Sequence, residues 1–188
     1  MTERQIYNQL KKEFGNCPDS LIKEAKKWYP ETKKYIEEKC DEFGITYLQG
    51  SALFSSLSPL KSVPENKKLF EAFLKGKRRG HFSNQVRKAK RILNLSDGTP
   101  KDYDKILSGS KTISFFRHLY TPQDNKYVVV DTHMLRLSFK GIVPRMTDYR
   151  YRVIAGCVKK LAKEANMKTS EMQSSLWLQA KNLYGNNI

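Results

Sequence analysis

The sequence predicts an all-α protein. Start and stop signals for helices recur along most of the 188 residues, and between them apolar residues return every three or four positions, which is the period of an amphipathic helix. The apolar run at 128–130 has the composition of a strand, but no second strand is evident to pair with it. We therefore interpret this run as a buried linker.

Five helices are expected in the first half of the chain, each bounded by a capping residue, a proline or a glycine. Thr2 and Gln5 form a capping-box pattern, and Pro30 is expected to end the second helix. The most apolar segment, 45–57, is expected at the centre of the core. The expected spans are 2–15, 18–30, 31–43, 45–57 and 64–76.

Six more helices are expected in the second half. After a basic break at 77–80, Ser83 is expected to cap a helix whose exposed faces carry lysine and arginine. Gly109 permits a turn with positive φ between two short helices. The first five of these are expected to begin at Ser83, Pro100, Ser110, Asp131 and Thr147, and the last is expected to begin at Thr169 or Ser170 and to stop at Gly185.

The charge indicates a polyanionic partner. A formal net charge of +16 and a pI near 9.7 concentrate phosphate backbones around the protein. Charge alone does not separate DNA from RNA, and the alternative is a soluble lysine-rich protein without such a partner. No segment nears the ~18 apolar residues of a membrane span, and the N-terminus lacks a signal-peptide pattern. An intracellular location with no membrane association is expected.

The three cysteines are far apart, and the histidines lack zinc-site spacing. Neither a disulfide framework nor a metal site is predicted, and no cofactor is expected.

Two segments carry the candidate chemistry. Residues 107–112, Leu-Ser-Gly-Ser-Lys-Thr, have the pattern of a tight turn into a helix, and residues 126–136, Lys-Tyr-Val-Val-Val-Asp-Thr-His-Met-Leu-Arg, run from an apolar stretch to a carboxylate that opens a helix. They place Lys111 and Asp131 at two helix starts.

In this order, the segments resemble those of the helix-hairpin-helix base-excision DNA glycosylases, the superfamily of endonuclease III. Gly109–Thr112 matches the end of that family's hairpin, and Val130–Arg136 matches its V-D-T-H-hydrophobic-x-R segment. Weaker matches at 53–56 and 82–89 extend the resemblance over residues 45 to 140. The chain departs from the family in having one hairpin glycine, a shorter turn, Leu57 in place of a glutamine, and no cysteine set for an iron–sulfur cluster.

The resemblance implies a two-lobed fold, with a central lobe at 45–127 and a second lobe formed by 1–44 and 128–188. It implies that Asp131 stabilises the cationic sugar formed as the base departs, and that Lys111 is the nucleophile, once it has lost its proton. The active site is expected between the lobes, on a nucleotide flipped out of double-stranded DNA. The residues expected to bind DNA are Gly109, Ser110, Thr112, Arg87, Lys88 and Arg136.

The expected activity is therefore that of a monomeric DNA glycosylase, with AP-lyase activity if Lys111 attacks the sugar. Each assignment has a simpler alternative. Asp131 has the features of a plain N-cap, Lys111 those of a surface lysine, and Gly109 those of a helix C-cap. The basic ridge that contains Arg87 and Lys88 has the features of a solvated helix face. The corresponding alternative function is a catalytically inactive DNA-binding protein of the same fold.

Overall fold

The computed structural model describes residues 1–77 and 82–185. Over this range the chain is all-α, as predicted, with ten helices and no strand. The helices are α1 Glu3–Gly15, α2 Asp19–Phe43, α3 Tyr47–Leu57, α4 Val63–Leu74, α5 Ser83–Leu93, α6 Pro100–Leu107, α7 Ser110–Tyr120, α8 Thr132–Ser138, α9 Asp148–Glu164 and α10 Thr169–Tyr184. Most of the basic break expected at 77–80 lies outside the described residues. No described helix is long and apolar enough to cross a membrane.

The chain divides into two compact units. The first combines both ends of the sequence, Met1–Pro30 and Thr121–Ile188, and the second is the continuous segment Glu31–Tyr120. Both boundaries differ from the positions named in the sequence analysis, because residues 31–44 belong with the central segment and residues 121–127 with the terminal helices.

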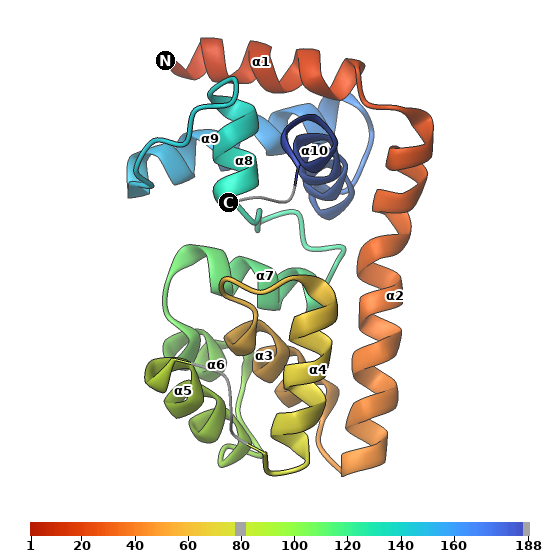
Figure 1. Cartoon of the computed structure of the whole chain (residues 1–188), viewed down its shortest axis with the longest axis vertical. Helices are drawn as coiled ribbons and strands as arrows, with labels where there is room; N and C mark the ends of the chain where they lie inside the picture. The colour runs from red at the N-terminus through yellow and green to blue at the C-terminus, as the bar shows by residue number, and fades with distance from the viewer. Residues whose placement is uncertain (78–81, 186–188) are drawn as a thin grey trace. The chain divides into compact units, whose positions relative to one another are not determined.

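In the first unit, helices from opposite ends of the sequence share one core. Helix α1 packs against α8, α9 and α10, and α10 packs against α8 and α9; Figure 1 shows the red and blue ends of the chain meeting in this unit. The linker 128–130 is buried and not a strand, as expected. The core side chains include Ile6, Leu10, Val130, Met134, Ile154, Val158, Leu161, Met172 and Leu176.

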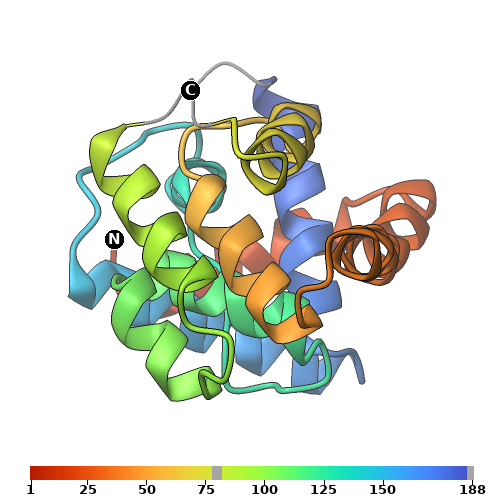
Figure 2. The same ribbon diagram turned by 90° about the horizontal axis from the view of Figure 1, so that it is seen from below.

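In the second unit, α3 is the central helix, as its apolar sequence predicts. Its residues from Gln49 to Leu57 are all buried, and α4, α5, α6 and α7 pack around it. Figure 2 shows α5 running beside α3. Gly50 permits a close approach to α2, because a Cβ at this position would lie 2.1 Å from the Cys40 Sγ.

Some predicted helix ends are wrong. Helix α2 continues through Pro30, although an interior proline removes one backbone hydrogen bond. Phe82, not Ser83, holds the N-cap position of α5. Lys168 precedes α10, and the first free N–H of that helix, on Thr169, donates to the Asn125 side chain at 2.9 Å. Asn125, which lies 44 positions from Thr169 in the sequence, thus caps α10 in place of a neighbouring residue.

Candidate functional site

The predicted hairpin is present in the second unit. Helix α6 ends at Leu107, α7 begins at Ser110, and the connection consists of Ser108 and Gly109, with φ of 49° and 83°. Two successive residues with positive φ reverse the chain sharply, and the conformation costs energy at Ser108 because it has a Cβ. The Gly109 carbonyl accepts the first helical bond of α7, from Ile113 N at 3.1 Å, so Gly109, rather than Ser110, precedes the first turn.

Side chains brace the two arms of the hairpin. The Arg117 guanidinium on α7 forms a two-pronged ion pair with the Asp104 carboxylate on α6, with Nε–Oδ1 at 3.1 Å, and both side chains are largely buried. The Tyr103 and Phe116 rings meet edge to face across the same interface, with centroids 6.2 Å apart. Paired charges and packed rings fix the angle between α6 and α7.

Lys88 supports the turn from a third helix. Its ammonium, at the middle of α5, donates to the Leu107 carbonyl and to the Ser108 hydroxyl, the latter at 2.7 Å. Partial burial lowers the Lys88 pKa, and the neighbouring Arg87 charge lowers it further. A cation at the C-terminal carbonyls of α6 is electrostatically favourable. Lys88 was predicted as a DNA contact; in the structure its ammonium is bonded to the hairpin.

The other predicted DNA contacts of this unit are accessible. Gly109, Ser110 and Lys111 are exposed, and Thr112 is partly exposed on the first turn of α7. Arg87 is exposed on α5 and donates to Asn84 Oδ1 at 3.0 Å. The exposed start of α7 presents backbone N–H groups, which is the arrangement that binds a phosphate.

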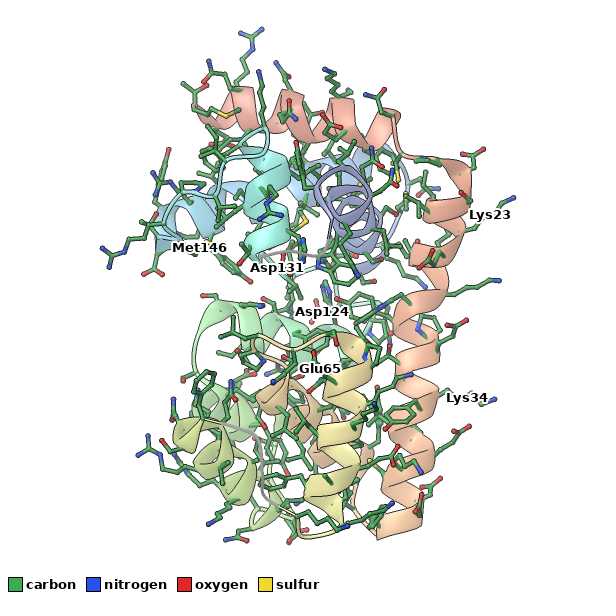
Figure 3. The ribbon with its side chains drawn as sticks, in the orientation of Figure 1. Lys23, Lys34, Glu65, Asp124, Asp131 and Met146 are labelled. Carbon is green, nitrogen blue, oxygen red and sulfur yellow. The ribbon has the colours of Figure 1, made fainter. Side chains whose placement is uncertain are left out.

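Asp131, in the first unit, is the N-cap of α8, as predicted. The buried linker 128–130 delivers it to the helix start, where its Oδ1 accepts from Met134 N at 3.0 Å. Its Oδ2 accepts from the Trp177 indole Nε1 on α10, also at 3.0 Å. Figure 3 labels Asp131 at the end of α8. Because each oxygen has a donor, the carboxylate orientation is fixed.

Two aromatic rings and a lysine lie around the Trp177 indole that holds this carboxylate. The His133 ring meets the indole edge-on at 5.8 Å, the Trp28 ring lies 6.2 Å away, and the Lys181 ammonium lies 4.4 Å from the indole centroid. The pKa of Tyr29 is raised well above its ordinary value, first by burial and then by the Asp131 charge. Asp131 itself is partly buried.

A comparison with protein families gave a match. The model of a family of unknown function, DUF7178, matches residues 1–183. The chain belongs to this family. The match spans both units of this DUF7178 chain. Neither the curated proteins nor the solved structures gave a match.

The predicted site residues of the DUF7178 chain fall into two sets. Lys111 and the hairpin residues lie in the unit 31–120, and Asp131 and Arg136 lie on or beside α8 in the other unit. Among the described residues, no three His, Cys, Asp or Glu side chains form a group that could hold a metal.

Trp177 is a residue of this site that the sequence did not reveal. The indole is only partly buried and holds Asp131 from 46 positions away, a separation at which helical periodicity carries no signal.

Proposed function

We propose that this chain is a DNA glycosylase of the helix-hairpin-helix type, which removes a base by cleaving its N-glycosidic bond. The observation that carries the proposal is the Asp131 carboxylate, held at a helix start by the Met134 N–H and the Trp177 indole. Glycosidic cleavage passes through a cationic sugar, and a fixed negative charge stabilises such a transition state.

Two further features support a DNA substrate. The net charge of +16 favours binding to a phosphate backbone. The exposed start of α7, reached through the turn at Ser108 and Gly109, offers N–H donors suited to one phosphate. A contact of this kind fixes the register of the strand without reading its sequence.

In this proposal Lys111 attacks the sugar C1′, and the base leaves with its bonding electron pair and takes up a proton. The C1′–O4′ bond of the resulting adduct then breaks, O4′ takes up the proton that the nitrogen loses, and the opened sugar is a Schiff base. This Schiff base permits strand cleavage by β-elimination, since it makes the neighbouring C2′ proton acidic. Where water replaces the amine as nucleophile, the product is an abasic site alone. Asp131 has the same role in both routes.

One observation favours a second candidate, a DNA-binding protein without catalysis. The Asp131 Oδ1 accepts the Met134 N–H, which is the full requirement of a structural N-cap, and its Oδ2 is already bonded to the Trp177 indole. The single hairpin glycine, Gly109, agrees with a hairpin that departs from the catalytic family.

Base release from duplexes carrying single lesions separates the two candidates. Asp131→Asn retains a capping side chain, so DNA affinity should stay within a few-fold while base release falls by orders of magnitude. Asp148→Asn is the matched control, because Asp148 is an exposed aspartate in the first turn of α9 in the same unit. Equal release by wild type and Asp131→Asn refutes the role of Asp131, and no release from any lesion favours the binding protein.

A further inference from the structure

Exposed apolar side chains are concentrated in the segment that joins α8 to α9 in the first unit. Of the eight large hydrophobic side chains exposed among the described residues, four lie between 142 and 149. Ile142 is 69% and Tyr149 is 65% exposed, and Val143 and Met146 lie between them in the sequence; Figure 3 labels Met146 on this segment. Exposed apolar side chains gathered in this way mark binding surfaces more often than isolated ones do. We call residues 142–152 the 142–152 patch.

The positive charge of the patch comes from arginine alone. The chain has 25 lysines and 10 arginines, yet residues 141–158 contain three arginines and no lysine. Arg145 and Arg152 are exposed. Arg150 donates to the Arg145 carbonyl at 2.6 Å and lies over the Phe139 ring at 5.9 Å. None of the ion pairs found in the described part of the chain involves these three arginines, so their charges are available to a partner.

This composition matches that of protein–protein interfaces. Tyrosine, methionine and arginine are enriched there and lysine is depleted, whereas the remainder of this chain is lysine-rich. A guanidinium also binds a carboxylate through two parallel hydrogen bonds, which an ammonium cannot do. We propose that the 142–152 patch binds a partner protein, through a segment that presents acidic side chains around an apolar centre. This inference does not depend on the proposed function.

Other occupants fit the patch less well. A DNA backbone makes no use of the exposed aliphatic groups of Ile142 and Val143. Clusters of about four to eight basic residues attract proteins to anionic membranes, whereas the patch has three arginines and Asp148. A second copy of the chain would bring like charges together, which opposes association.

The probe is a synthetic amphipathic peptide with glutamate and leucine at helical spacing, titrated into the full chain at about 0.15 M salt. Methyl NMR shifts are expected at Ile142, Val143 and Met146. Leu60, 77% exposed in the other unit, is the internal control and should not shift. A scrambled peptide of equal composition, and one with lysine in place of glutamate, should bind at least about tenfold more weakly.

Two sets of variants distinguish peptide binding at the 142–152 patch from nonspecific attraction by the net charge of the protein. Ile142→Ser with Met146→Ser leaves the charge unchanged and should weaken peptide binding about tenfold or more. Arg145→Glu with Arg152→Glu should do the same, whereas Lys159→Glu with Lys163→Glu, an equal charge change at exposed positions of α9, should have a much smaller effect. Equal losses from both charge pairs, or methyl shifts caused by duplex DNA or phosphatidylserine vesicles but not by the peptide, overturn the proposal.

Discussion

The Trp177 indole donates its only N–H to the Asp131 Oδ2 across 3.0 Å, and so joins the last helix to the start of α8. The Asp131 Oδ1 is occupied by the Met134 N–H at the same distance. Two hydrogen bonds therefore restrain the carboxylate. One comes from the backbone of the same helix, and the other comes from a side chain on α10. A carboxylate held in this way needs little reorganisation to meet a developing positive charge.

Replacing Trp177 with phenylalanine tests whether this restraint matters for function. The change removes the indole N–H and keeps a ring against His133 and Trp28. We expect base release to fall about tenfold or more, since a lost oriented hydrogen bond costs on the order of 1–2 kcal/mol. Tyr151→Phe is the control, because it deletes the hydroxyl that donates to Val128 O at 2.6 Å in the same unit. Equal effects of the two variants on release would assign Trp177 a purely structural role.

Replacing Lys88 with methionine tests the support of the hairpin turn. In this variant the Leu107 carbonyl and the Ser108 hydroxyl lose their charged donor, so the free energy of unfolding should fall by about 1–3 kcal/mol. Lys90→Met removes the same charge from an exposed position of the same helix and should change stability by less than about 0.5 kcal/mol. Urea unfolding measures both variants. Equal stabilities would show that the bonds from Lys88 to the turn contribute nothing.

The start of the hairpin should be sensitive to acid. The Thr99 hydroxyl, then Lys105 and the Thr99 N–H, lower the pKa of Asp102 to about 2. Because the folded pKa lies below the ordinary value of 3.8, this stabilisation is complete above about pH 4 and is lost as the pH falls through about 2. Asp102→Asn should flatten this part of the stability curve, and Thr99→Ala should do so partly. Parallel curves for wild type and Asp102→Asn between pH 5 and 2 would contradict the prediction.

The salt dependence of DNA binding tests the predicted ridge on α5. Arg87 is exposed there, and each lost phosphate contact reduces the slope of log affinity against log salt by about 0.9. Arg87→Ala should lower the slope by this amount. Arg4→Ala, at an exposed position of α1, should leave it unchanged. A slope unaffected by Arg87→Ala would show that this face of α5 does not meet the backbone.

What the sequence predicted correctly depends on local rules. Asp131 could be recognised as a cap because its partner, Met134, is three positions away, and the turn at Gly109 because a positive φ favours glycine. The bonds from Lys88 to Ser108 and from Trp177 to Asp131 span 20 and 46 positions, and no periodicity connects residues so far apart. The continuation of α2 through Pro30 was mispredicted, because tertiary packing can override the preference of a single residue.

Borohydride trapping on DNA that contains an abasic site tests the central claim most directly, because it captures the Schiff base of the attacking amine. We expect wild type to form a covalent adduct, Lys111→Ala to form none, and Lys101→Ala, which removes an exposed lysine from the neighbouring helix α6, to form it normally. An adduct that persists in Lys111→Ala would contradict the assignment of the nucleophile. The absence of any adduct, together with no base release, would contradict the enzyme itself.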